Sequence, residues 1–174
     1  MSSDFELVQI VDRALSEAVR RSGSWLVCQP GCTQCCHGPF EISQLDAHRL
    51  RRGLAELESH DPQRAGAVRD RARHAPQLTN FSDDAPCPVL DLETGTCDLY
   101  ASRPIICRCF GPPVRCDSGA VGVCELCFDG ASDEEIAACL VDFDPDGLES
   151  VLIDELERTT GVRGMTTVAL TLTS

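Results

Sequence analysis

The chain has 174 residues, a formal net charge of −13 and 12 cysteines. This length suits one domain over residues 1–174 that buries a hydrophobic core without needing a metal. The negative charge argues against nucleic acid as a partner, because neutralising phosphates requires clustered cations. No apolar run is long enough to span a bilayer, and the acidic N-terminus has no secretory signal pattern. We therefore expect a cytoplasmic protein with no nucleic-acid partner and no membrane association.

The N-terminal segment combines a helix with a cysteine-rich loop. Apolar residues recur at helical spacing over about 4–21, and Gly23 is expected to end this helix. Four thiols and one imidazole then fall within ten residues, 28–37. Proline and glycine inside and just after this stretch break regular structure, so it is predicted to be a loop.

Two further helices are predicted before the second group of cysteines. Ser43 has the pattern of an N-terminal cap, and leucines at near-helical spacing continue to Leu57. Asp61 and Pro62 are typical of a helix start. The arginine-rich segment that follows, 63–74, has little apolar character and is expected to be a solvated helix.

The rest of the chain is predicted to be a hairpin, short helices and a strand or tail. Residues 75–85 have a loop composition, and 87–100 form a hairpin with its turn at 93–95. The C-terminal helical region is expected over 132–161, and 166–173 as a short strand or frayed tail. The fold class is thus mainly α with a small β-hairpin, with helices around a cysteine-rich centre.

The density of cysteines points to metal binding. In a reducing cytoplasm disulfides are rare, so such a pattern is typical of metal ligation or catalysis. Thiolates select zinc, iron–sulfur clusters or copper(I) over hard cations. A disulfide scaffold is the remaining alternative, and it would require an export route. Cys124 and Cys127 have the spacing of a zinc-binding pair, as do Cys32 and Cys35.

Spacing alone does not separate zinc from an iron–sulfur cluster, since both are held by four thiolates. The excess of cysteines favours iron–sulfur, because one zinc ion would use only four of them. The vicinal pair Cys35 and Cys36 adds to this, because adjacent side chains do not face the same way. Either the two bind different metal atoms or one is a plain buried thiol. A lone histidine is more often structural than a metal ligand, so His37 is expected to have a structural role.

Several blocks downstream make the pattern specific. They are Cys87-Pro88-x-Leu90, Cys97-x-x-Tyr100, Arg103-Pro104-x-x-Cys107-Arg108, and Cys124 before Leu126 and Phe128. Together with the first loop, these blocks resemble the YkgJ-type cysteine-cluster (CxxCxxCC) family over about residues 25–128. Its members are described as zinc- or iron-chelating proteins related to a domain of flagellin lysine N-methylase.

The resemblance implies eight metal ligands: Cys28, Cys32, Cys35, Cys36, Cys87, Cys97, Cys107 and Cys124. Four cysteines lie outside the pattern and are expected to be small buried hydrophobes: Cys109, Cys116, Cys127 and Cys139. Of these, Cys127 is the least certain to be a plain hydrophobe, given its spacing from Cys124. Arg103 and Arg108 belong to the family signature, and each either lowers the pKa of a nearby thiol or forms an ion pair with a carboxylate.

The leading hypothesis is a protein that binds an iron–sulfur cluster, or alternatively zinc, with a redox or methyl-transfer-related accessory role. The alternative is a structural zinc-binding interaction module, which would contact a protein partner through its acidic surface or the arginine-rich helix. No glycine-rich nucleotide fingerprint or hydrolytic triad is recognisable, so no enzymatic activity is assigned.

Overall fold

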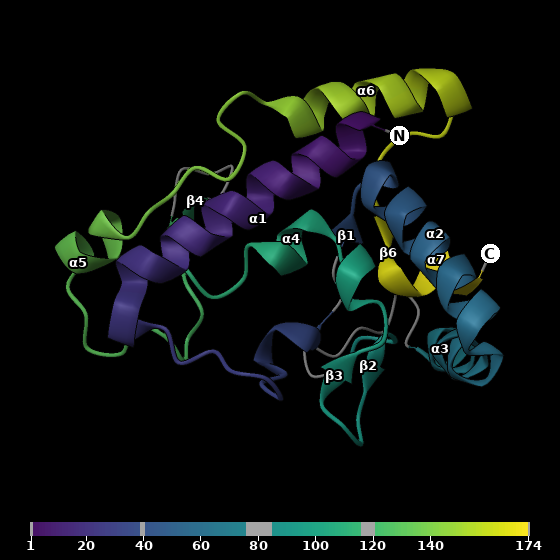
Figure 1. Ribbon diagram of the computed structural model, residues 1–174, viewed down its shortest axis with the longest axis horizontal. Coiled ribbons are helices and arrows are strands. Elements are labelled where there is room, and N and C mark those ends of the chain that lie inside the picture. Colours follow the sequence, from purple (N-terminus) through teal and green to yellow (C-terminus); the bar gives the residue numbers. More distant parts are fainter. Residues whose placement is uncertain (1, 39–40, 76–84, 116–120, 174) are drawn as a thin grey trace. The chain divides into compact units, whose positions relative to one another are not determined.

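The computed structural model of the chain describes residues 2–38, 41–75, 85–115 and 121–173 (Figure 1). Most of the regular structure in these ranges is helical, which confirms the mainly α prediction. The helices are α1 (Ser2–Ser22), α2 (Gln44–His60), α3 (Pro62–His74), α4 (Ile105–Arg108), α5 (Asp133–Ala138), α6 (Leu148–Thr160) and α7 (Val168–Thr173). Three short 3-10 helices are η1 (Gly23–Trp25), η2 (Gln34–Cys36) and η3 (Tyr100–Ser102).

The described β-structure consists of short antiparallel pairs. The strands are β1 (Glu41–Ile42), β2 (Leu90–Asp91), β3 (Thr96–Cys97), β4 (Val114–Arg115), β5 (Val121–Gly122) and β6 (Thr166–Thr167). They pair as β1 with β6, β2 with β3, and β4 with β5. The β2–β3 pair is the hairpin predicted over 87–100. Most of the loop expected at 75–85 falls outside the described residues.

Two compact units divide the chain, and each is discontinuous in sequence. Unit 1 consists of residues 1–29 and 105–152, and unit 2 of residues 30–104 and 153–174. The last boundary falls within α6. Organisation as a single domain remains a prediction.

Unit 1 is built on the long helix α1, which packs against α4. Leu7 and Val11 of α1 are fully buried. Arg108, at the end of α4, is buried and donates to both carboxylate oxygens of Asp12, at 2.8 and 3.0 Å. This ion pair is thus an internal link of the unit.

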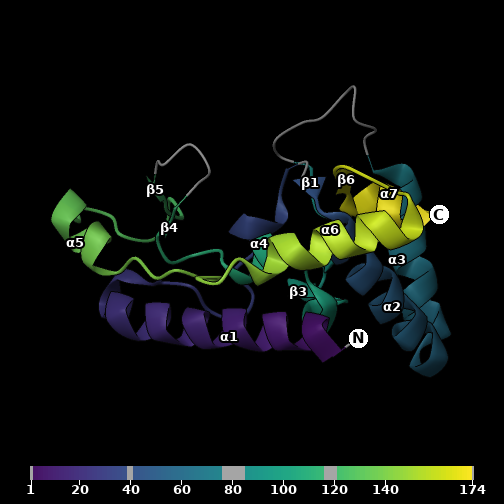
Figure 2. The ribbon, with the colours of Figure 1, turned by 90° about the horizontal axis from the view of Figure 1, so that it is seen from above.

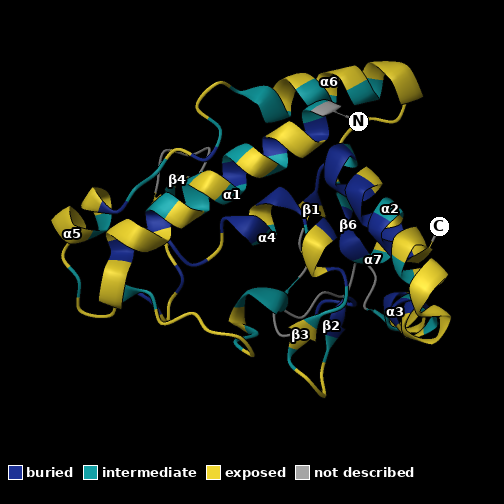
Figure 3. Ribbon diagram, in the orientation of Figure 1, coloured by how far each residue is buried: buried dark blue, intermediate teal, exposed yellow. Residues whose placement is uncertain are grey.

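In unit 2, local capping fixes where the helices begin. Ser43 accepts a hydrogen bond from the backbone N–H of Asp46, and Asp61 accepts one from that of Arg64. Both caps are where the sequence predicts them. Figure 3 shows that α2 presents buried residues on one side and exposed residues on the other, as expected of an amphipathic helix.

Helix α3 differs from the solvated helix predicted for 63–74. Ala65, Val68 and Ala72 recur at helical spacing and are buried in the main apolar cluster. Small side chains allow α3 to pack closely against α2, although its sequence is polar overall. The buried face of α3 contributes only about one small residue per turn. The surrounding arginines therefore make the sequence look polar on all sides.

The C-terminal segment is mostly a helix, so the strand or frayed tail expected over 166–173 is wrong for most of its length. Only Thr166–Thr167 pair as a strand, and Val168–Thr173 form α7. Helix α7 packs against α2 and α3, and the three lie together in both views (Figure 1 and Figure 2). Burial of Val168 and Leu172, one helical turn apart, outweighs the strand preference of the Thr/Val alternation.

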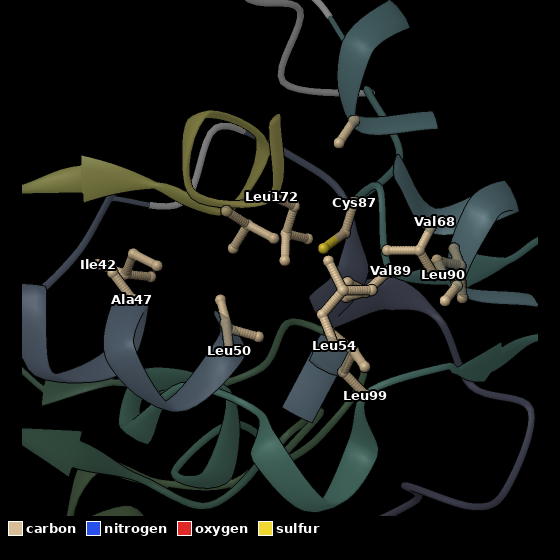
Figure 4. Packing of buried hydrophobic residues seen from close by; sticks show 13 residues of the cluster. Ile42, Ala47, Leu50, Leu54, Val68, Cys87, Val89, Leu90, Leu99 and Leu172 are labelled. Carbon is tan, nitrogen blue, oxygen red and sulfur yellow. The ribbon is translucent and has the colours of Figure 1, made fainter. Parts of the chain in front are cut away.

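An apolar cluster of buried residues forms the core of unit 2. Figure 4 shows Leu50, Leu54 and Leu172 in this cluster, with Cys87 beside them. Cys36 and Cys97 pack against it from the side. A thiol-bearing region therefore borders the core. Within the described part of the chain, no helix is long and apolar enough to cross a membrane.

Candidate metal centre

Five of the eight predicted ligands lie in unit 2: Cys32, Cys35, Cys36, Cys87 and Cys97. The first three come from the loop that contains η2, and the other two come from the hairpin region. The remaining three, Cys28, Cys107 and Cys124, lie in unit 1. The predicted ligands are thus divided between the two units.

Backbone hydrogen bonds join the first loop to the segment before the hairpin. The N–H of Cys87 donates to the carbonyl of Cys36 at 2.7 Å, and the N–H of Gly38 donates to that of Ala85 at 2.9 Å. His37 and Pro86 form an isolated antiparallel bridge between these bonds. The loop therefore pairs with the hairpin segment like a short strand, at the residues that carry thiols.

The hairpin turn lies against the same loop. Cys97 pairs with Leu90 across the hairpin, and Gly95 closes the turn with a left-handed φ of +66°. A Cβ added at Gly95 would lie 3.3 Å from the carbonyl oxygen of Gly31. Glycine is required here by both the backbone conformation and the close approach of the loop.

The vicinal thiols of Cys35 and Cys36 interact with each other. A hydrogen bond with Cys36 is the main cause that raises the pKa of Cys35, and burial raises it further. The sequence-based expectation that these side chains face apart therefore does not hold in the 3-10 turn of η2. Two adjacent donors that converge in this way could serve one metal atom as well as two.

Burial is the main cause of the pKa shifts of the two hairpin thiols, Cys87 and Cys97. It raises the pKa of Cys87 to about 11, while a backbone N–H bond from Val89 lowers it. Burial also raises the pKa of Cys97, and the N–H of Leu99 opposes that shift. The charge of Cys35 raises the pKa of both thiols. These three sulfurs are therefore close enough to repel one another as thiolates, and a bound cation would relieve that repulsion.

Two arginines favour ionisation of the unit 2 thiols. Arg103 lowers the pKa of Cys35 and Cys97, and Arg71 lowers that of Cys87. The guanidinium of Arg103 also stacks on the ring of Tyr100, 3.9 Å from its centroid. Of the two arginines in the family signature, Arg103 is thus near thiols, while Arg108 has an ion pair with Asp12. The role of Arg71 was not predicted, because it lies on α3, far from the motif in sequence.

A buried carboxylate anchors the hairpin to α3. The side chain of Asp98 is only 2% exposed, and it accepts hydrogen bonds from Arg64 and Arg71. Arg71 also donates to the carbonyl of Pro88 at 2.8 Å. Two of the arginines in the basic run therefore have intramolecular roles beside Cys97.

His37 has a structural hydrogen bond, as expected for a lone histidine. Its Nδ1 lies 3.0 Å from the carbonyl oxygen of Thr33, so that nitrogen must be the donor. Nε2 is the nitrogen that remains for a metal.

Three cysteines of unit 1 lie in a small apolar cluster. Cys124, Cys127 and Cys139 are buried in it, and Cys109 is buried elsewhere in the unit. Cys139 donates to the carbonyl of Arg21 at 3.5 Å, in keeping with a plain buried thiol. Cys116 lies outside the described residues.

Cys127 lies beside one of the predicted ligands. Its Sγ lies 3.9 Å from that of Cys28, although the two residues are 99 positions apart in sequence. Its spacing from Cys124 was the one signal that pointed to a ligand.

The donor set suits a soft metal. All eleven described cysteines are present as thiols. Thiolate sulfur selects zinc and iron–sulfur clusters over hard cations, so the residues fit zinc or iron. In the described ranges, no three side chains of histidine, cysteine, aspartate or glutamate already stand together at a separation that would hold a metal ion.

The model of one protein family, "CxxCxxCC: Putative zinc- or iron-chelating domain", matches residues 27–127. This match covers more than half of the chain and includes all eight predicted ligands. The family name has two residues between its first and second cysteines, whereas this chain has three between Cys28 and Cys32. No curated protein and no solved structure matches the chain. The chain belongs to the CxxCxxCC family of zinc- or iron-chelating domains.

Proposed function

We propose that this metal-chelating protein holds an iron–sulfur cluster on the thiols of unit 2. The observation that carries the proposal is the number of thiols in that unit: Cys32, Cys35, Cys36, Cys87 and Cys97. One structural zinc ion takes four ligands, so a fifth thiol in the same unit favours a centre with more than one metal atom. The three other predicted ligands, Cys28, Cys107 and Cys124, are proposed to bind metal in unit 1.

The electrostatics of the unit 2 thiols are compatible with such a centre. A cluster would supply one-electron chemistry when bound. The protein's own part is to hold the thiols at the border of the apolar core and to offset their charge with Arg103 and Arg71. We expect metal binding to release the thiol protons and to draw the side chains into one shell.

The proposed role is redox, in a reducing cytoplasm, where disulfides are rare and thiols remain available as ligands. Because the family that the chain resembles is described as related to a domain of flagellin lysine N-methylase, we propose that the redox role is an accessory one, related to methyl transfer.

A structural zinc site is the second candidate. It is favoured by the packing of Cys36 and Cys97 against the main core, with Cys87 inside it. A metal at that point would link the first loop and the hairpin to the helices. Under this hypothesis the protein would be an interaction module without redox chemistry.

Anaerobic purification followed by metal analysis and visible absorption tests both candidates. We expect iron, with an absorption that bleaches reversibly on addition of dithionite. Colourless protein with stoichiometric zinc would refute the iron–sulfur assignment and support the structural one. Folded protein that takes up neither metal would refute both.

The site itself is tested by Cys36→Ser, with Cys139→Ala as the matched control. Cys36 lies in the unit 2 loop, whereas the Cys139 thiol binds a backbone carbonyl in unit 1. We expect the first variant to lose metal and the second to retain it. Equal metal content in both variants would remove Cys36 from the ligand set.

A further inference from the structure

The sulfurs of Cys28 and Cys127 lie 3.9 Å apart, although the two residues are 99 positions apart in the sequence. Both cysteines belong to unit 1, so their proximity is a feature of one compact unit. A disulfide has an S–S distance of about 2.05 Å, so the two sulfurs need to approach by about 2 Å to form one. Partial rotation about a Cα–Cβ bond supplies a displacement of this size.

The two thiols differ in their access to solvent. Cys28 is exposed and lies in a segment without regular structure that follows η1. Cys127 is only 3% exposed and lies in the small apolar cluster of unit 1. An oxidant in solution therefore reaches Cys28 first. Redox-sensing cysteines are solvent-accessible and often lie next to a second cysteine that reacts with their oxidised form.

Contacts beside the cysteines hold the two segments together. The N–H of Phe128 donates to the carbonyl of Trp25 at 3.1 Å, and the two rings stack with centroids 6.1 Å apart. Phe128 has a φ of +61°, and it is the sole non-glycine residue with positive φ in the described ranges. A bulky residue adopts this conformation only where its surroundings enforce it. The turn that carries Cys127 is therefore firmly attached to the segment before Cys28.

Gly111 leaves room for the Cys28 sulfur. Its φ is +111°, and a Cβ added there would lie 3.2 Å from the Sγ of Cys28. Any other residue at this position would strain the backbone and push the sulfur away from its place.

From these observations we propose that Cys28 and Cys127 form a reversible disulfide when the protein reacts with hydrogen peroxide. In the first step the Cys28 sulfur attacks one peroxide oxygen, the O–O bond breaks, and the thiol proton leaves with the other oxygen as water. Cys28 is then a sulfenic acid. In the second step the Cys127 sulfur attacks the Cys28 sulfur, the S–O bond breaks, and a second water leaves. Two thiols thus lose two electrons and two protons, and one peroxide is reduced to two water molecules.

The charge of the protein favours an uncharged oxidant. The formal net charge is −13, and Glu125 and Asp129, two positions on either side of Cys127, are both exposed. Anionic small-molecule disulfides are repelled by such a surface, whereas hydrogen peroxide carries no charge. Transient, redox-sensing disulfides are also the kind that a reducing compartment permits.

The disulfide gives Cys127 a role that metal chelation does not, because Cys127 is not among the eight predicted ligands. Cys28 is one of these ligands, so oxidation would withdraw it from metal binding. That consequence rests on the proposed function, whereas formation of the disulfide does not.

The experiment identifies which cysteines become linked. Full-length protein, reduced and freed of metal, is treated with one equivalent of hydrogen peroxide, and the remaining thiols are alkylated. Cleavage after arginine and glutamate releases residues 126–134, in which Cys127 is the only cysteine, and residues 22–41, which contain Cys28. Mass spectrometry with fragmentation then locates the link. We expect the link between Cys28 and Cys127 to form first, to account for most of the linked product, and to be reversed by dithiothreitol.

Three variants separate the roles of the two thiols. Cys127→Ala should accumulate the Cys28 sulfenic acid, which dimedone traps, several-fold more than the wild type. Cys28→Ala should leave Cys127 reduced, because Cys127 is buried. Cys139→Ala is the control, because this thiol lies in the same apolar cluster and bonds to the carbonyl of Arg21, and it should form the link as the wild type does. If circular dichroism shows that Cys127→Ala is unfolded, Cys28→Ala alone provides the test, since Cys28 is exposed.

A link from Cys127 mainly to any cysteine other than Cys28 would overturn the proposal. So would a wild-type protein in which Cys28 is oxidised to the sulfinic acid without any link, or a Cys28→Ala protein whose Cys127 is oxidised as fast as in the wild type. Protein unfolded in urea gives the reference for chance pairing, and an equal preference for Cys28 there would show that the fold does not create the pair. Full metal retention by protein that carries the disulfide would instead remove Cys28 from the ligand set and leave the disulfide standing.

Discussion

The backbone N–H of Cys87 donates a 2.7 Å hydrogen bond to the carbonyl of Cys36, so two predicted ligands 51 positions apart are joined through their own main chains. This bond and the neighbouring bridge between His37 and Pro86 fix the first loop against the hairpin segment. The two segments that carry the unit 2 thiols are therefore joined through their main chains without help from a metal. What a metal would add is relief of the repulsion among their charged forms.

The stability of the metal-free protein should fall at alkaline pH. Burial raises the pKa of Cys87 to about 11, against a value near 9 for an ordinary cysteine. As pH rises, the unfolded chain loses this proton before the folded protein does. The contribution to stability is therefore full below pH 9 and is lost between about pH 9 and 11. Two pKa units correspond to about 3 kcal/mol.

Urea unfolding of reduced, metal-free protein at several pH values in this window measures the effect. The pKa values of Cys35 and Cys97 are also raised, so these thiols should likewise lower the stability of the folded protein as pH rises. Cys87→Ala is the control and should show a shallower decline. Parallel curves for this variant and the wild type would contradict the assignment to Cys87. Zinc should reverse the trend, because metal binding requires thiolates and strengthens as pH rises.

Replacing two helical glycines by alanine should change the stability of the protein in opposite directions. A Cβ at Gly53 in α2 would lie 2.5 Å from the Cβ of Ser102, so Gly53→Ala should destabilise the protein by roughly 1–3 kcal/mol. A Cβ at Gly66 in α3 would meet nothing within 4 Å, so Gly66→Ala should stabilise it by about 0.5–1 kcal/mol. Both are measured by chemical denaturation.

The double variant Gly53→Ala/Ser102→Gly separates a clash from other causes. Removing the Ser102 side chain should recover part of the loss at Gly53, since the clash is with that side chain. A double variant that is less stable than the sum of the two single changes would show that α2 and η3 do not pack as described.

Asp98 should contribute more to the stability of the protein than a surface carboxylate of the same charge. It is buried between Arg64 and Arg71 and holds the hairpin on α3. Asp98→Asn should destabilise the protein by about 3 kcal/mol, because it weakens both ion pairs and leaves polar groups poorly matched. Asp70→Asn is the matched control, since Asp70 pairs with Arg73 on the exposed face of α3 and should cost under about 0.5 kcal/mol. Similar losses for the two variants would contradict the buried role.

Much of this fold can be predicted from local interactions between residues that are close in the sequence. Ser43 and Asp61 cap helices because their side chains reach the third N–H of the next turn. Gly95 marks the hairpin turn because other residues avoid its left-handed conformation. These features depend on neighbours within four residues, so a single sequence suffices to predict them.

Features that depend on distant partners could not be predicted in this way. The segment 168–173 alternates like a strand, yet it is helical because Val168 and Leu172 pack on α2 and α3. Cys127 lies beside Cys28 only because the contact between Phe128 and Trp25 brings their segments together. Likewise, nothing near Arg71 in the sequence indicates that its charge acts on Cys87.

The charge of Arg103 should favour the ionisation of Cys35 and Cys97 in unit 2. Its guanidinium lowers the pKa of Cys35 and Cys97. Arg103→Gln should raise both pKa values and weaken zinc binding, because the thiols would then lose their protons less readily. Arg103→Lys is the control that keeps the charge and should retain most of the affinity, although it loses the planar stacking on Tyr100. The measurements are the pH dependence of thiol alkylation and a competitive zinc titration. If the Gln and Lys variants lost affinity equally, Arg103 would act through packing, and its charge would have no part in metal binding.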